Sequence, residues 1–462
     1  MNATRLLIVN RGEIAVRVVR AARELGLTSI VTHSEADADS LAVKLADEAV
    51  CIGPAQAAKS YLNIEAILAA AREVGAEAVH PGYGFLSESA DFARRVVEAG
   101  MIFVGPDAEL IERMGNKAEA RRTALAAGVP VVPGSPSAVA DVEEAVKVAL
   151  EVGYPLLIKA AAGGGGRGIR TAADEAELRA QLPLAQSEAR AAFGDDSVYL
   201  ERFIERARHI EVQILADGER AVHLYERECS LQRRRQKVFE ESPSPALDEA
   251  ARERLCASAV ALAEHVGYKA AGTLEYLYDD DSGEFFFIEM NTRIQVEHPV
   301  TEMITGVDLV RAMLRVCLGE PLGVAQDDIA IRGWAVEMRI NAEDPDNGFF
   351  PSLGQVERLT WPTGPGVRVD SALYEGYRMP PFYDSLVAKL VVWDEDRASA
   401  LVRAGRALDE FTLEGFTTTA GLHRRLVEDQ AVRRGDFHTG TLELWLDTAS
   451  AASAPSVQEK AS

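Results

Sequence analysis

Residues 285–299 read Phe-Phe-Phe-Ile-Glu-Met-Asn-Thr-Arg-Ile-Gln-Val-Glu-His-Pro, and their polarity alternates in steps of two. The polar positions are Glu289, Asn291, Arg293, Gln295 and Glu297. Successive side chains of an extended chain point to opposite faces, so these five groups can share one face. An edge strand with one solvent-exposed face would show the same alternation, but Asn and Glu are poor strand formers. A face that carries acids, an amide and a base favours a binding site.

The residues before this stretch predict a hairpin: a strand at 274–278, a turn at 279–283 and a returning strand at 284–290. In the simplest register Glu275 lies diagonal to Glu289 on one face, about 7–8 Å away between Cα atoms. Two carboxylates that converge beside the Asn291 amide repel each other unless a cation lies between them. Mg²⁺ prefers oxygen ligands and is commonly shared with substrate phosphates, so the hairpin predicts a magnesium site.

Length and composition describe an ordinary globular protein. The chain has 462 residues, 47% hydrophobic and 26% charged, enough for roughly three domains. The net charge of −23 argues against a general surface for nucleic acid or anionic membrane. The four cysteines include no C-x-x-C pair, so no zinc or disulfide framework is predicted and a cytoplasmic location is expected. No run of eighteen apolar residues predicts a membrane span.

The first part of the chain predicts a parallel α/β domain over residues 1–115. Strands are expected at 5–10, 29–33, 76–79 and 102–105, with helices at 14–25 and 64–74. The first turn lacks G-x-G-x-x-G, which argues against NAD binding there. Tyr83 stands between two glycines, either in a plain tight turn or projecting into a cleft.

A glycine-rich segment follows a predicted strand at 154–159 and precedes another at 169–171. Five of the six residues 163–168 are glycine, so their main-chain N–H groups can approach phosphates closely. The segment is not a Walker loop, because Lys159 precedes the glycines and a strand follows them. A flexible surface hairpin is the alternative, but a mobile lid over ATP is favoured.

Further along, 198–204 and 208–215 read as strands, and 247–265 and 308–318 as helices. The run Gln-Arg-Arg-Arg-Gln-Lys at 232–237 concentrates positive charge; in so acidic a chain an anion pocket is favoured over a nucleic-acid patch or a solvated loop. A last domain is expected over 334–447, with Glu337 and Arg339 on one strand face, short strands and a helix at 397–410. Residues 448–462 are rich in Ala and Ser and are expected to be disordered.

Taken together, these motifs closely resemble those of biotin carboxylases, the ATP-grasp subunit or domain of acetyl-, propionyl- and pyruvate carboxylases. The matching signatures start at Asn10 (Asn-Arg-Gly-Glu-Ile), His80 (His-Pro-Gly-Tyr-Gly-Phe-Leu-Ser-Glu), Gly163 (Gly-Gly-Gly-Gly-Arg-Gly), Ile288 (through Glu302) and Arg339 (Arg-Ile-Asn-Ala-Glu-Asp-Pro). The resemblance runs from about residue 5 to about residue 446. A four-glycine run alone is weak, whereas the central stretch is very specific.

The resemblance implies an α/β and α+β multidomain fold: a Rossmann-like N-terminal domain, an ATP-grasp domain at 116–333 with a lid at about 131–203, and a C-terminal biotin carboxylase domain. It also implies site residues in three groups. ATP contacts would be Lys117, Lys159, Gly164, Gly165, Gly166, Glu201, Ile204, His209, Gln232 and Leu277. Glu275, Glu289 and Asn291 would bind Mg²⁺ or Mn²⁺, expected as two ions. Lys237, Arg293, Gln295, Val296, Tyr83 and Arg339 would hold bicarbonate and biotin, with Glu297 as general base; Glu297, Arg339, Lys237 and Arg293 would be catalytic.

The activity implied by the resemblance is carboxylation of biotin N1′ through carboxyphosphate, the first half-reaction of an acyl-CoA carboxylase, as in fatty acid biosynthesis. Bicarbonate is a poor electrophile, so Glu297 would deprotonate it for attack on ATP, and Arg339 would grip the biotin ureido oxygen. No Lys in the chain has a Met neighbour as a biotin acceptor would, so biotin is expected on a separate biotin carboxyl carrier protein, with a carboxyltransferase as further partner. A homodimer is also expected, with Arg17 as a candidate interface residue.

Two residues depart from the family pattern: Arg235 stands where His or Asn is usual, and Arg202 where Lys is frequent. Two other functions stay open at this level. One is another bicarbonate-phosphorylating ATP-grasp ligase, such as half of a carbamoyl-phosphate synthetase. The other is a non-catalytic ATP-binding regulatory subunit. The Arg339 segment favours a biotin enzyme over the first, and the intact Glu297, Glu289 and Lys237 argue against the second.

Overall fold

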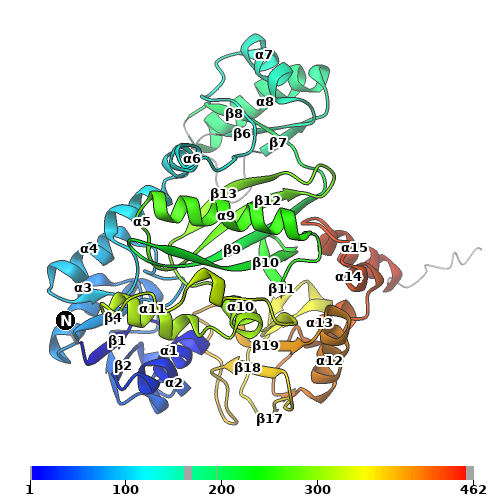
Figure 1. Ribbon diagram of the computed structural model, residues 1–462. Helices are drawn as coiled ribbons and strands as arrows, with labels where there is room; N and C mark the ends of the chain where they lie inside the picture. Colours follow the sequence, from blue (N-terminus) through cyan, green and yellow to red (C-terminus); the bar gives the residue numbers. More distant parts are fainter. Residues whose placement is uncertain (1–2, 161–168, 194, 454–462) are drawn as a thin grey trace, which may run out of the picture. The chain divides into compact units, whose positions relative to one another are not determined.

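A computed structural model describes residues 3–160, 169–193 and 195–453 of the chain (Figure 1). The chain divides into two compact units. The larger comprises Met1–Val129, Arg208–Tyr276 and Glu289–Ser462, and the smaller comprises Pro130–Ala207 and Leu277–Ile288. The domain boundaries expected at 115/116 and 333/334 both lie within the larger unit. In the described part of the chain, no helix is long and apolar enough to cross a bilayer.

The N-terminal part of the larger unit is a five-stranded sheet with the order β3-β2-β1-β4-β5 and parallel pairing throughout. Its strands are β1 (Arg5–Ile8), β2 (Thr28–His33), β3 (Glu48–Cys51), β4 (Ala78–His80) and β5 (Ile102–Phe103). The helices are α1 (Gly12–Glu24), α2 (Leu41–Leu45), α3 (Ile64–Glu73), α4 (Ala90–Glu98) and α5 (Ala108–Gly115). The predicted parallel α/β arrangement is confirmed.

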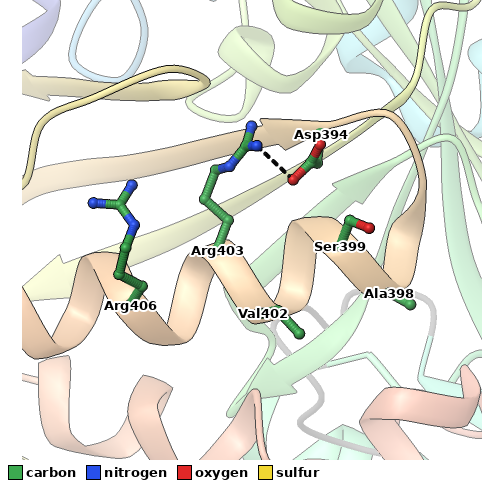
Figure 2. Close-up of a pocket in the computed structure, with 6 residues that line it drawn as sticks. All are labelled: Asp394, Ala398, Ser399, Val402, Arg403 and Arg406. Carbon is green, nitrogen blue, oxygen red and sulfur yellow. Dashed lines mark ion pairs between the residues drawn. The ribbon is translucent and has the colours of Figure 1, made fainter.

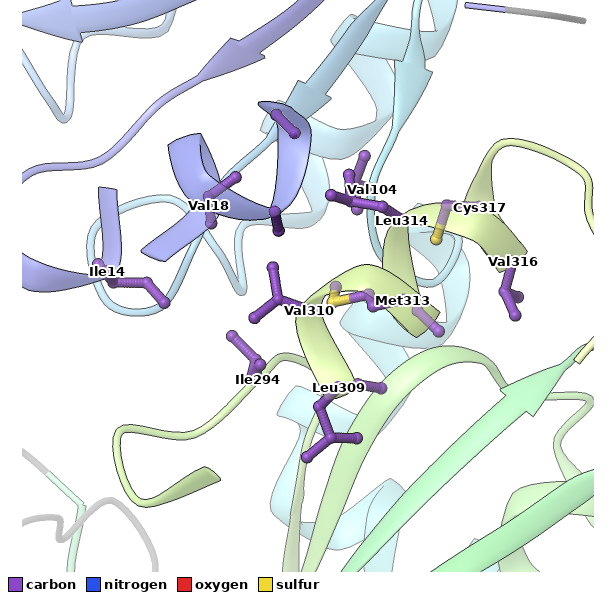
Figure 3. Close-up of a cluster of buried hydrophobic side chains, with 14 of the residues drawn as sticks. Ile14, Val18, Val104, Ile294, Leu309, Val310, Met313, Leu314, Val316 and Cys317 are labelled. Carbon is purple, nitrogen blue, oxygen red and sulfur yellow. The ribbon is translucent and has the colours of Figure 1, made fainter. Parts of the chain in front are cut away.

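The apolar run of β1 explains this layering. Leu6 and Ile8 point into a core shared with α1, whereas Leu7 and Val9 point into the opposite core. Both faces are covered, as is usual for parallel sheets. The first core continues into α11 (Leu309–Cys317), whose side chains pack against α1 (Figure 3).

The second sheet has eight strands in the order β13-β12-β9-β10-β11-β14-β19-β18. Their bounds are β9 (Ala207–Asp217), β10 (Ala221–Arg233), β11 (Gln236–Ser242), β12 (Lys269–Asp279), β13 (Phe285–Asn291), β14 (Trp334–Asn341), β18 (Val367–Ser371) and β19 (Leu386–Asp394). Because β11 pairs with β14, the sheet runs continuously across the boundary expected at residue 333. Glu240 of β11 lies opposite Glu337 of β14, and Arg339 of β14 lies opposite Lys389 of β19.

Helices and short strands complete the larger unit. α9 (Glu249–His265), α10 (His298–Thr305) and α12 (Arg397–Glu410) contact the eight-stranded sheet. The remaining elements are α6 (Lys117–Ala126), α13 (Ala420–Leu426), α14 (Gln430–Arg434), α15 (Thr441–Ser453), β15 (Glu343–Asp344), β16 (Phe350–Pro351), β17 (Arg358–Thr360) and β20 (Thr412–Glu414). The start of the tail expected to be disordered from residue 448 is helical, because α15 continues to Ser453. Residues 454–462 lie outside the described part.

The smaller unit contains a three-stranded antiparallel sheet with the order β7-β6-β8 and two helices. Its elements are α7 (Val142–Val152), β6 (Leu156–Ala160), β7 (Ile169–Ala172), α8 (Glu175–Phe193) and β8 (Val198–Arg202). Leu156, Ile158 and Leu200 of the sheet form a core with Leu178 and Leu182 of α8. The predicted strands around the glycine run are therefore present, but the run itself, with Gly164, Gly165 and Gly166, lies outside the described residues.

In the larger unit, the glycine that follows β20 gives a test of how closely the backbone packs there. Gly415 has φ +117°, and a Cβ there would lie 1.8 Å from the carbonyl oxygen of Gln355. We expect Gly415→Ala to destabilise the protein by about 3 kcal/mol or more through backbone strain plus the clash. Gly376 has φ +90° but open space around it, so Gly376→Ala is the matched control and should cost about 1–2 kcal/mol. Thermal melting compares them; equal shifts would contradict the packing role of Gly415.

Candidate active site

Lys237 of β11 is the centre of the candidate site. Its ammonium donates to Glu211 (2.6 Å), Glu275 (3.0 Å) and Glu297 (2.6 Å), so all three of its N–H donors are used by carboxylates. Burial disfavours its charge, but the three carboxylates outweigh burial and raise the pKa of Lys237 well above its usual range. Lys237 therefore carries a permanent positive charge inside the sheet.

Glu297 lies between two cations. Its Oε1 accepts from Lys237, and its Oε2 accepts from Arg339 Nη2 at 3.0 Å. The carboxylate is completely buried. Burial raises the pKa of Glu297, but Lys237 and Arg339 outweigh that effect and hold it well below the usual range, so the group is ionised at neutral pH. Arg339 also donates from Nε to the buried Glu240 at 2.5 Å, which fixes its guanidinium.

The polar residues of 285–299 converge, but not as one extended strand. β13 ends at Asn291, and Glu297 is the N-cap of α10, so the expected strand face is wrong beyond Asn291. Arg293 lies in a bend, where it donates to Asn291 Oδ1 (3.2 Å) and to Gln295 Oε1 (2.9 Å). Ile294 anchors the bend, because it is buried with Leu309 and Val310 (Figure 3). In residues 285–299 apolar side chains such as Ile294 pack into the core, and the polar side chains converge at the site.

Glu275, Glu289 and Asn291 form the acidic group predicted for Mg²⁺. Glu275 accepts from Asn291 Nδ2 (2.9 Å) and from Gln295 Nε2 (3.3 Å). Glu289 is partly exposed and forms an ion pair with Lys117 at 3.8 Å. Burial, and then the charge of Glu275, raise the pKa of Glu289. This repulsion is what a divalent cation would relieve, so the residues fit the ion.

A different group, Glu211, Glu275 and His209, has its ligand atoms within 4.8 Å of one another. Lys237 already donates to both of its carboxylates, and His209 Nε2 lies 3.0 Å from Glu275 Oε2. The ammonium therefore supplies the positive charge that a metal would supply there. The carboxylate with the least compensated charge is Glu289, which favours the Glu275–Glu289 side for the metal.

The predicted nucleotide contacts occur in both units, and each set is considered by itself. In the larger unit, Lys117 begins α6, and His209 Nδ1 lies 3.0 Å from Gln232 Nε2. In the smaller unit, Lys159 is ion-paired with Glu201. Ile204 belongs there to a small apolar cluster, against which Leu277 packs. These residues offer polar and apolar surfaces of the kind an adenine nucleotide requires.

The two departures from the family pattern have different surroundings. Arg202 pairs with Asp279 and Glu284, both at 3.2 Å, so it braces the hairpin turn between β12 and β13. Arg235 is exposed in the turn between β10 and β11, with φ +67°. Within the predicted anion pocket at 232–237, Arg233 lies over the Phe349 ring at 3.7 Å and is therefore a packing residue.

Tyr83 and Arg17 have partners within the chain. The Tyr83 hydroxyl donates to Glu13 of α1. Arg17, the candidate interface residue, is mostly buried and pairs with Glu302 (3.0 Å) and Asp308 (2.6 Å). Its position is accounted for by these two ion pairs, so the structure does not place it at a free surface.

Several site residues escaped sequence reasoning. Glu211 alternates with His209 on β9, and that alternation could have identified it. Arg227, which donates to Glu211 at 2.6 Å, and Glu240 carry no local signal, because their neighbours come from other strands. Glu88, which pairs with Arg293 at 2.9 Å, was likewise missed.

A separate surface cavity of about 470 Å³ lies along α12 and is lined by Asp394, Ser399, Val402, Arg403 and Arg406, with Ala398 (Figure 2). Arg403 pairs with Asp394 at 2.7 Å and donates to the Trp393 carbonyl. These partners give Arg403 a structural role, and the cavity does not include the residues of the site.

The larger unit combines an ionised buried carboxylate held by two cations, an acidic pair suited to Mg²⁺ and polar residues suited to a nucleotide. Together with the fold, this defines an ATP-dependent ligase. Family models agree: the N-terminal domain of biotin carboxylase matches residues 2–111, the ATP-binding domain of the carbamoyl-phosphate synthase L chain matches 116–325, and the biotin carboxylase C-terminal domain matches 337–444.

Individual relatives match over nearly the whole chain. Biotin carboxylase 1 of Bacillus subtilis is 52% identical over 442 residues, covering 96% of this chain and 98% of its own. The bicarbonate-bound biotin carboxylase domain of a thermophilic 2-oxoglutarate carboxylase has a TM-score of 0.91 at 46% identity. The match covers 96% of this chain and 98% of that domain. The biotin carboxylase domain of the Hydrogenobacter thermophilus 2-oxoglutarate carboxylase, a dimer in complex with MgADP and bicarbonate, has a TM-score of 0.86 at 47% identity. The match covers 96% of this chain and 97% of that chain.

This chain belongs to the biotin carboxylase family, and it is an ATP-dependent carboxylase ligase. The family resemblance and the three-part α/β architecture predicted from the sequence are therefore confirmed.

The charge balance at Lys237 yields a stability prediction. Lys237→Met leaves Glu211 and Glu297 buried with less positive charge nearby. We expect the free energy of unfolding to fall by about 3–5 kcal/mol at pH 7. The depressed pKa of Glu297 stabilises the wild type above the unfolded carboxyl pKa, about 4.3, and this contribution is lost as pH falls. The gap in unfolding free energy between wild type and variant should therefore narrow below pH 5. A gap independent of pH in denaturant titrations would contradict this account.

Proposed function

We propose that this chain carboxylates biotin at N1′ in two steps, with ATP and bicarbonate as the other substrates. One observation carries the proposal: the two oxygens of Glu297 face different cations, Lys237 at 2.6 Å and Arg339 at 3.0 Å. A single ionised carboxylate thus lies between a cation suited to bicarbonate and a cation suited to the ureido oxygen of biotin. Neither alternative function requires the second cation.

In the first step, Lys237, Arg293, Gln295 and Val296 hold bicarbonate beside Glu297. Bicarbonate that binds to Lys237 draws part of the ammonium charge away from Glu297, so the pKa of Glu297 rises and the carboxylate becomes a better base. Glu297 then removes the bicarbonate proton, and the resulting oxyanion attacks the γ-phosphate of ATP in line. The products are ADP and carboxyphosphate.

The phosphoryl group must be held while negative charge shifts onto ADP. In the larger unit, Lys117, His209 and Gln232 are the proposed nucleotide contacts; in the smaller unit they are Lys159, Glu201, Ile204 and Leu277. Glu275, Glu289 and Asn291 would hold Mg²⁺ or Mn²⁺, proposed as two ions, which neutralise phosphate charge when bound.

In the second step, carboxyphosphate breaks down to CO₂ and phosphate. The phosphate takes the proton from biotin N1′, and Arg339 stabilises the enolate-like ureido oxygen while N1′ captures CO₂. Glu240 holds Arg339 by accepting from its Nε at 2.5 Å. Tyr83 is proposed to border the biotin position, with its hydroxyl tied to Glu13.

The partners are proposed by similarity and chemistry. Biotin would arrive on a biotin carboxyl carrier protein, and a carboxyltransferase would use the carboxybiotin to carboxylate an acyl-CoA. A homodimer is supported by the dimer of the Hydrogenobacter relative. The thiols of Cys51, Cys229, Cys256 and Cys317 are all free, which supports a reducing, cytoplasmic location.

Arg339→Ala tests the biotin half of the reaction. We expect ATP hydrolysis with Mg²⁺ and bicarbonate to lose its stimulation by free biotin while a slow biotin-independent rate remains. Arg358→Ala is the matched control, because Arg358 is exposed and its ion pair is with Glu414, outside the proposed site. Unchanged biotin-dependent turnover in Arg339→Ala would refute the assignment. Wild-type hydrolysis that needs bicarbonate but ignores biotin would instead indicate the synthetase-like ligase.

Glu297→Gln tests the general base. The amide keeps the shape and can still accept from one cation, but it cannot take a proton, so bicarbonate-dependent ATP cleavage should fall by about 10²- to 10⁴-fold. Binding of ATP, measured by calorimetry, should stay within about threefold of wild type, since Glu297 is not a proposed nucleotide contact. A variant that retains a tenth or more of the wild-type rate would show that another group acts as the base.

A further inference from the structure

Val296 is the one proposed bicarbonate ligand without a polar side chain, so only its main chain can bind the anion. Its carbonyl oxygen accepts from Lys389 Nζ at 2.8 Å, which leaves the N–H. Within the described residues no group accepts a hydrogen bond from that N–H, and Val296 is only partly buried. A main-chain N–H that makes no hydrogen bond within the described residues is a suitable anion ligand.

Two completely buried side chains hold the peptide groups on either side of this N–H. The imidazole Nδ1 of His298 lies 2.8 Å from the carbonyl oxygen of Gln295, and Lys389 binds the carbonyl of Val296. A peptide group is planar, with its C=O and N–H on opposite sides. Holding the Gln295 carbonyl therefore sets the direction of the Val296 N–H, and holding the Val296 carbonyl sets the peptide that enters Glu297.

The geometry assigns the protonation of His298. A carbonyl oxygen only accepts, so Nδ1 must carry the hydrogen. Burial, and then the charge of Lys389, lower the pKa of His298 well below its usual range, so the ring is neutral with an unprotonated Nε2. That nitrogen lies 4.0 Å from Glu302 and has no hydrogen-bond partner in the described part of the chain. His298 is therefore arranged as a fixed donor to one carbonyl.

Lys389 reaches Val296 from another part of the fold. It lies on β19 opposite Arg339, and its Nζ is also 3.2 Å from Glu13, which accepts from the Tyr83 hydroxyl. A methionine would fill this volume without burying a charge, so packing alone does not explain a lysine there. The contacts of Lys389 therefore connect the bend that contains Val296 with Glu13 and Tyr83, which lie on the proposed biotin side.

We propose that His298 and Lys389 are positioning residues for bicarbonate, which lock the two peptide groups flanking Val296 so that its N–H faces the anion. The inference rests on the proposed function. It adds two residues outside the predicted site, neither of which touches substrate. Loosening either peptide group should weaken bicarbonate binding specifically, because the nucleotide contacts lie on other elements.

The test compares steady-state kinetics of four variants in bicarbonate-dependent ATP hydrolysis. His298→Leu and Lys389→Met remove the side-chain donors, and the Leu variant leaves the Gln295 carbonyl with only the longer contact to the His298 main-chain N–H, at 3.5 Å. Each variant should raise the bicarbonate KM about tenfold while the ATP KM stays within about twofold. His298→Asn puts an amide N–H near the Nδ1 position and should keep the bicarbonate KM within about threefold of wild type. Val392→Ala, a truncation of a buried β19 side chain that packs in a cluster without residues of the bend or of α10, controls for general destabilisation.

An unchanged bicarbonate KM in folded His298→Leu would overturn the proposal. An equal rise in both KM values, or a rise in the bicarbonate KM of Val392→Ala as large as that of Lys389→Met, would also overturn it. If Lys389→Met does not fold, the His298→Asn and His298→Leu pair decides alone. Failure of the proposed function is distinguishable in the wild type itself, whose ATP hydrolysis would then either not need bicarbonate or not rise with free biotin.

Discussion

The site depends on one buried ammonium. Lys237 donates to three carboxylates and offsets the repulsion among them. Replacing such a cluster with apolar residues would cost the fold little, whereas removing one member leaves an uncompensated charge. The arrangement is therefore best understood as functional. It keeps Glu297 ionised and ready to change basicity when an anion competes for the same cation.

Besides these ion pairs, contacts to the main chain order the segment that follows β13. The bend after β13 is anchored by Ile294, held at its carbonyls by His298 and Lys389, and ended by the start of α10. Each restraint acts on a different atom of the bend. The side chains of Arg293, Gln295 and Glu297 can therefore converge although no strand aligns them.

The continuity of the eight-stranded sheet explains how distant segments share the site. β11 supplies Lys237 and Glu240, and its pairing with β14 brings Arg339 beside Glu297. The pairing of β14 with β19 then places Lys389 beneath the bend. The boundary expected at residue 333 separates the segments before and after it by their motifs. The hydrogen bonds between β11 and β14 nevertheless join these segments into one sheet.

The sequence by itself determined the parallel α/β start, the strands around the glycine run, the hairpin of β12 and β13, and the family. These features are local: hydrophobic periodicity and short motifs depend on neighbouring residues. Only the tertiary structure decided that the extended alternation stops at Asn291, that Arg17 and Tyr83 have internal partners, and that Glu211, Arg227, Glu240 and Lys389 support the site. Those contacts join residues far apart in the chain, and burial gives the resulting charges their strength because water no longer screens them.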